Sequence, residues 1–174
     1  MVKQFAEWLS TTSPSVFIQN HNAWVIPAIQ SIHIIGIAVV LGSVFMVYLR
    51  ILGWACMDQT LRQTTNRFAP WVTNGLYLML ATGVLMVVGE PVRELVTFSF
   101  WLKMFLVAVS TVFVVVFRKS LRKNEQRWEE TLIKRRSIQG LAILTFLIWV
   151  GIIILGRLIA YDHIWGPWSP ATKA

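Results

Sequence analysis

Four long apolar segments constrain the fold of this chain more than any other feature of its sequence. Each approaches or exceeds the roughly 20 residues that an α-helix needs to cross the hydrocarbon core of a bilayer. Most charged residues lie between the segments, and only 14% of the chain is charged whereas 56% is hydrophobic. A soluble domain of this length exposes far more polar surface. The pattern predicts one all-α domain over residues 1–174, a polytopic membrane four-helix bundle, with apolar segments at 24–48, 71–89, 98–117 and 138–161.

Prolines and segment ends set the expected helix bounds, which are roughly 14–50, 70–89, 97–120 and 137–161. Ser13 and Pro14 form an N-cap and first-position pair, so the first long helix is expected to begin there and to run past Pro27. Before it, Phe5 and Trp8 alternate with charged residues, which predicts a short amphipathic helix lying in the membrane interface. This N-terminal stretch has no apolar core of the length found in cleavable signal peptides.

Basic residues give the expected orientation. Eleven of the sixteen lysines and arginines fall in two connections, after the first helix and in the basic loop 118–137. By the positive-inside rule these connections are cytoplasmic, so both termini are expected on the periplasmic side of a bacterial inner membrane. The net charge of +8 therefore indicates topology and contacts with anionic lipids rather than a nucleic-acid partner.

The ionisable residues inside the spans gather near the outer end of the predicted bundle. Lys103 lies about 8 Å and Arg157 about 6 Å from the nearest outer helix end, at 1.5 Å per residue, and His33 lies in the middle or outer half of its span. A charge inside a bilayer is costly unless it meets a partner or a wet cavity. Either the two cations extend to the headgroups, or they form a pocket for a carboxylate, a propionate or a phosphate.

His33 has three candidate roles. It is a neutral core histidine bonded to a neighbouring helix, an axial ligand of haem b, or a contact and proton acceptor for a quinone. Gly36, one turn later, leaves room for a planar cofactor or for another helix close to the backbone.

A second haem ligand is hard to find in the sequence. His21 is about 18 Å from His33 along a continuous helix, so both bind one iron only if the helix breaks, for instance near Pro27. His163 would have to fold inward from beyond the last span. Five-coordinate iron held by His33 alone remains open.

Other chemistries have little support. The chain contains no CxxC, HExxH, Walker or GxGxxG motif, so no catalytic residue is assigned and enzymatic activity is left open. Cys56 is the only cysteine, which excludes an internal disulfide. The spans contain no Asp or Glu, which argues against a proton pump of the usual kind.

Short motifs carry a family resemblance. The segments HIIGIAVVLGSVFMVYLRILG (33–53), FWLKMFL (100–106) and GRLIAY (156–161) resemble those of a family of uncharacterised bacterial four-helix inner-membrane proteins. Tyr48 stands where that family has an aspartate. In size and helix count the chain is also similar to haem b-type four-helix electron-transfer subunits and copper-resistance membrane proteins. The resemblance singles out His33, Gly36, Arg50, Lys103, Trp149, Gly156, Arg157 and Tyr161.

We therefore expect an electron-transfer or quinone-interacting membrane subunit that works with a dehydrogenase partner. The expected cofactor is haem b or a quinone. The alternatives are a cofactor-free scaffold or accessory subunit, which binds lipids, a protein partner or a second copy of itself, and a small channel or carrier for an anionic or aromatic solute. The candidate binding residues are His33, Gly36, Lys103, Arg157, Tyr161 and His163.

Overall fold

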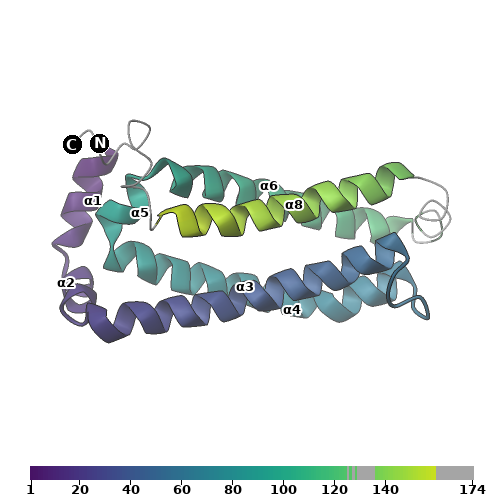
Figure 1. Cartoon of the computed structure of the whole chain (residues 1–174), viewed down its shortest axis with the longest axis horizontal. Helices are drawn as coiled ribbons and strands as arrows, with labels where there is room; N and C mark the ends of the chain where they lie inside the picture. The colour runs from purple at the N-terminus through teal and green to yellow at the C-terminus, as the bar shows by residue number, and fades with distance from the viewer. Residues whose placement is uncertain (125, 127, 129–135, 160–174) are drawn as a thin grey trace.

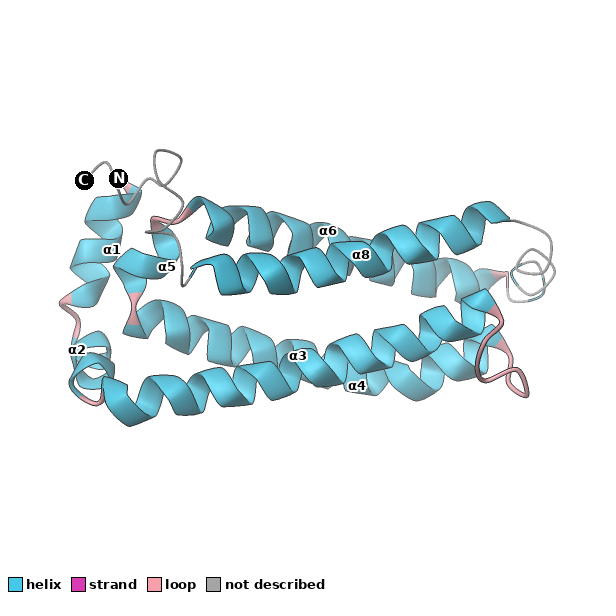
Figure 2. Cartoon of the chain, in the orientation of Figure 1, coloured by secondary structure: helices cyan, strands magenta, loops and turns pink. Residues whose placement is uncertain are grey.

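The computed structural model describes residues 1–124, 126, 128 and 136–159, and every element in this part of the chain is helical (Figure 2). Four helices are long and apolar enough to cross a membrane, as the sequence predicts. Within the described residues, the helices with defined bounds include three shorter ones. In chain order the helices are α1 (Val2–Ser10), α2 (Ser13–Asn20), α3 (Asn22–Leu52), α4 (Leu61–Gly89), α5 (Pro91–Leu95), α6 (Phe98–Lys123) and α8 (Arg136–Leu158).

The four long helices lie alongside one another in two antiparallel pairs, α3 with α4 and α6 with α8 (Figure 1). Helices α1, α2 and α5 lie together at one end, which we call the α5 end. The opposite end carries the α3–α4 connection and the C-terminus of α6, and we call it the basic end. Packing within each pair is more extensive than packing between the pairs.

Two clusters of buried side chains hold the pairs together. One lies in the middle of the bundle and includes Val40, Val72 and Trp149; the other lies toward the basic end and includes Leu61 and Leu121. The outward faces of the same helices are also apolar. Large exposed side chains on them include Ile35, Leu80, Phe105, Val116 and Leu147. Apolar side chains on both the inside and the outside are what a bilayer requires of a spanning bundle.

The first apolar region forms two helices, not the single helix expected over 14–50. The break lies at His21. Its ring Nδ1–H donates to the Phe17 carbonyl at 2.9 Å, and its backbone N–H donates to Ile18 instead, at 3.2 Å. The side chain thus takes the acceptor that the next helical backbone bond would use. Beyond the break α3 continues through Pro27 to Leu52.

Helix α4 begins nine residues earlier than the expected start at residue 70. Thr60 and Gln63 form a capping box: the Thr60 hydroxyl accepts from the Gln63 backbone, and the Gln63 side chain accepts from the Thr60 backbone. This reciprocal pair satisfies two N–H groups at the helix start. The polar first turns precede the apolar segment, so Pro70 lies inside the helix.

Candidate functional site

A short hydrogen bond joins His33 of α3 to Thr82 of α4. The Nδ1 atom of His33 lies 2.7 Å from Oγ1 of Thr82. The Thr82 hydroxyl also donates to the Leu78 carbonyl at 2.7 Å, so its only proton is already used. His33 must then donate from Nδ1, and the neutral ring keeps a bare lone pair on Nε2. No partner for Nε2 is found within the described residues.

Lys103 of α6 supplies the positive charge near this pair. Its ammonium lies over the ring of Phe100, 5.5 Å from the centroid, and its stem runs beside Gly156 of α8, where a Cβ would lie 3.6 Å from Cδ. The ammonium is close enough to act electrostatically on His33. The ammonium thus lies about one turn nearer the α5 end than the backbone of Lys103, a position that fits both a contact with this pair and an extension toward the headgroups.

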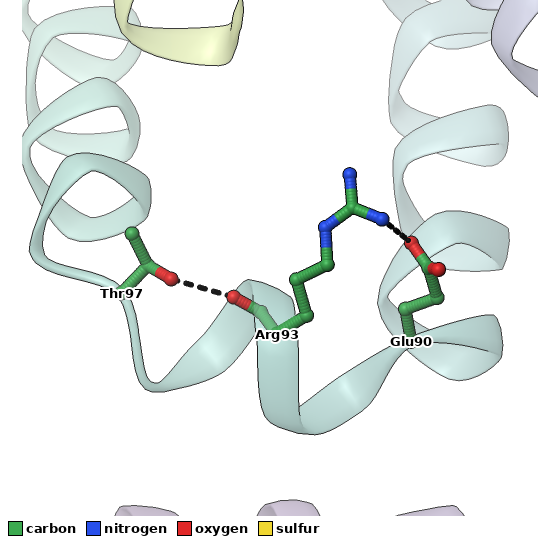
Figure 3. Close-up of polar contacts among 3 residues, drawn as sticks. All are labelled: Glu90, Arg93 and Thr97. Carbon is green, nitrogen blue, oxygen red and sulfur yellow. Dashed lines mark hydrogen bonds and ion pairs between the residues drawn. The ribbon is translucent and has the colours of Figure 1, made fainter. Parts of the chain in front are cut away.

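The third ionisable group of the site, after His33 and Lys103, is Glu94 of α5. Its side chain is only 4% exposed. Burial raises the pKa of its carboxyl, the nearby charges of Lys103 and Arg93 oppose that rise, and Glu90 adds to it. Arg93 binds the Glu90 carboxylate at 2.6 Å, and the Thr97 hydroxyl donates to the Arg93 carbonyl at 2.6 Å (Figure 3). These two bonds brace α5 from both sides.

Together His33, Thr82, Glu94 and Lys103 form a polar cluster at the α5 end, to which four different helices contribute. Its chemistry is specific. The Nε2 atom of His33 accepts a hydrogen bond or binds a metal, Lys103 donates to an oxygen, and Glu94 carries or releases a proton. In an apolar surrounding such groups act strongly on a bound polar molecule.

The other residues singled out by the sequence lie around this cluster or away from it. Gly36 faces α4, where a Cβ would meet Met79 at 3.0 Å, so the contact seen there is between helices. Arg157 is exposed in the last turn of α8 and forms no hydrogen bond or ion pair with a described residue. Tyr161 and His163 lie outside the described residues.

His21 and His33 are not brought together. Helix α3 runs without a break from Asn22, so the two rings are about 18 Å apart along its axis. His21 is exposed and its ring packs on Phe17, with centroids 4.7 Å apart. Within the described residues His33 is the one histidine in a position to bind an iron in the bundle, and no group of three metal-binding side chains occurs there.

Three residues from the family motifs have structural contacts. The Arg50 Nε donates to the Gln59 carbonyl at 2.8 Å and ties down the α3–α4 connection. Trp149 is buried in the central core, and Gly156 lies beside the Lys103 stem.

Sequence reasoning did not select Thr82 or Glu94 as site residues. For Thr82 the available signal is a threonine in an apolar span, at a depth similar to that of His33. Glu94 lies outside the spans, and only the fold shows that α5 turns it inward.

A comparison with protein-family models places residues 5–162 in a family of unknown function, DUF6644. The chain belongs to this family. A search of curated proteins found no match, and a search of solved structures found none either. Membership in DUF6644 agrees with the resemblance to an uncharacterised family and assigns no activity, so the function must be argued from the polar cluster.

Proposed function

We propose that this DUF6644 protein is a quinone-interacting electron-transfer subunit of a bacterial inner membrane and works with a dehydrogenase partner. The polar cluster holds the quinone head group, and the α5 end faces the periplasm. The observation that carries the proposal is the His33–Thr82 bond, because it leaves Nε2 of the half-buried His33 ring as an open acceptor.

An open acceptor near a half-buried cation matches the reduced form of a quinone. A quinol hydroxyl donates to Nε2 of His33, and the Lys103 ammonium donates to an oxygen or stabilises negative charge as electrons arrive. Electrons come from the dehydrogenase, and the two protons that convert quinone to quinol come from the aqueous phase at the α5 end. The cluster thus binds quinol more tightly than quinone, since neutral Nε2 cannot donate to a carbonyl.

Haem b is the second cofactor proposed for the same atom. The open Nε2 of His33 is a suitable axial ligand, with Nδ1–H held by Thr82 as an orienting bond. An absorption spectrum of the detergent-purified protein, with and without dithionite, separates the two cofactors. A Soret band that shifts on reduction and is lost in His33→Ala would select haem over quinone.

The quinone proposal is tested by extraction and by binding. Organic extracts of the purified protein should contain a quinone, and decyl-ubiquinol should bind more tightly than decyl-ubiquinone. His33→Leu should remove this preference, and Lys103→Met should weaken the binding of both the quinol and the quinone. Thr73→Val is the matched control, because Thr73 bonds only to its own helix, at the Ala69 carbonyl. An extract free of quinone together with no saturable binding would exclude the proposal.

A further inference from the structure

A cavity of about 150 Å³ lies between the two helix pairs, on the side of the bundle toward the basic end. Its walls come from α3, α4, α6 and α8 and are mostly aliphatic and aromatic, including Val44, Phe68 and Phe117. It is separate from the polar cluster, since Val72, the residue of α4 on its wall that lies nearest Thr82, is about 15 Å from it along the helix. A cavity of this size holds an apolar group about as large as a benzene ring.

One buried polar atom on the wall has no partner among the described residues. It is the hydroxyl of Thr65, a residue that lines the cavity. Other threonines in the long helices, such as Thr73 and Thr111, donate to the carbonyl four residues earlier. An unbonded hydroxyl in an apolar surrounding is costly. Thr64 is unbonded as well but is absent from the cavity wall, so of the two hydroxyls only that of Thr65 lies beside the space a bound molecule would fill.

The cavity reaches both the outer surface and the basic end. Phe113 and Leu141 line it and are 49% and 52% exposed, so its wall extends to the face that meets membrane hydrocarbon. Arg118 and Trp128 line it as well, and Lys119 and Arg122 follow on α6. Basic residues at such a helix end attract anionic headgroups.

We propose that this cavity is a binding site for one anionic phospholipid. Part of one acyl chain fills the cavity while the rest lies along the outer face, an ester oxygen accepts from Thr65, and the phosphate lies near Arg118. The combination of apolar walls, an unbonded hydroxyl and a basic end fits this class of amphiphile better than a neutral lipid. The site extends the protein's binding beyond the quinone at the other end.

The first test locates the chain in the wild-type protein. Liposomes of phosphatidylcholine contain a trace of phosphatidylglycerol with a diazirine in one acyl chain, and labelled residues are identified by peptide mass spectrometry after irradiation. We expect labels on cavity-facing residues such as Val44, Val72 and Val114. Labels confined to the outward-facing Val112, Val115 and Val116 would overturn the proposal.

The second test uses matched variants. Ala142 lines the cavity and is 5% exposed, whereas Ile143 beside it is 48% exposed. Ala142→Phe should abolish cavity labelling and Ile143→Phe should leave it intact. If Ala142→Phe does not fold, the labelling pattern of the wild-type protein still tests the proposal. Equal cavity labelling in folded Ala142→Phe and folded Ile143→Phe would overturn it.

Head-group recognition is tested by native mass spectrometry in mixtures of the two lipids. Arg118→Gln should lower the preference for phosphatidylglycerol about fivefold, the contribution expected of one basic residue near an anionic surface. Thr65→Val should lower lipid occupancy, whereas Thr64→Val should not, because Thr64 is equally unbonded but is absent from the cavity wall. An unchanged lipid preference in Arg118→Gln would contradict the head-group assignment.

Discussion

At the scale of single residues, the hydroxyl of Thr82 decides what His33 can do. It accepts from Nδ1 and so fixes both the ring orientation and the position of the lone pair. Thr82→Val should release the ring and weaken quinol binding about fivefold, corresponding to the roughly 1 kcal/mol of one hydrogen bond. Titration with decyl-ubiquinol measures the change. Thr73→Val should keep the wild-type affinity for quinol. Equal affinities in Thr82→Val and Thr73→Val would show that the His33–Thr82 bond has no role in quinol binding.

Glu94 predicts a pH dependence of stability. Burial raises its pKa above the usual 4.5, so the folded protein keeps a proton that the unfolded chain releases. The resulting stabilisation is fully present below pH 4.5 and is lost as pH rises through the folded-state pKa. Glu94→Gln cannot ionise, so its melting temperature in detergent should fall less than that of wild type as pH rises toward about 8.

The control for this measurement is Glu7→Gln, which alters an exposed residue of α1 and should follow the wild-type profile. A Glu94→Gln profile that parallels wild type would show that the buried carboxyl contributes nothing to the pH dependence.

The sequence indicates only part of the candidate site. His33 and Lys103 stand out because ionisable residues are rare in apolar spans, and this reasoning uses depth alone. It does not report which side of a helix faces inward, so it treats Lys103 and the exposed Arg157 alike. Glu94 depends on the turn that α5 makes between two spans, which local sequence does not specify.

At the scale of helices, Gly75 determines how closely α3 and α4 approach. A Cβ on Gly75 would lie 2.6 Å from Cγ2 of Val40, and Val40 is 1% exposed, so it has no space to move. Gly75→Ala should therefore separate the helices and destabilise the protein by about 1–3 kcal/mol. Thermal unfolding in detergent measures this loss.

Gly42→Ala on α3 provides the comparison. A Cβ there would meet nothing within 4 Å, so alanine should be neutral or stabilising by up to about 1 kcal/mol through its higher helix propensity. If both variants unfold at the wild-type temperature, the close approach of α3 and α4 does not limit stability.

Helix bounds show where hydropathy is informative and where it is not. It locates the four apolar spans, because each must match the bilayer along its length. It misses the start of α4, since the capping box of Thr60 and Gln63 precedes the apolar part. It also misses the break at His21, which arises from a side chain competing with the backbone for the Phe17 carbonyl. Both signals are local hydrogen bonds that an average over residues cannot detect.

At the scale of the whole molecule, the two ends differ in chemistry. The α5 end gathers the buried Glu94 and the half-buried His33 and Lys103, whereas the basic end holds an apolar cavity bordered by arginine. The two helix pairs pack less on each other than within themselves. The proposed quinone head group and the proposed lipid would therefore enter between the pairs at opposite ends, without sharing contacts.

The proposed orientation is testable with the protein's own cysteine. Cys56, the only one in the chain, lies in the α3–α4 connection at the basic end and is partly exposed. The positive-inside rule places that end in the cytoplasm. A membrane-impermeant maleimide should therefore label Cys56 only after spheroplasts are permeabilised. In Cys56→Ser with Ser10→Cys, a change at the α5 end, labelling should occur in intact spheroplasts. Labelling of Cys56 in intact spheroplasts would reverse the orientation and move the polar cluster to the cytoplasmic side.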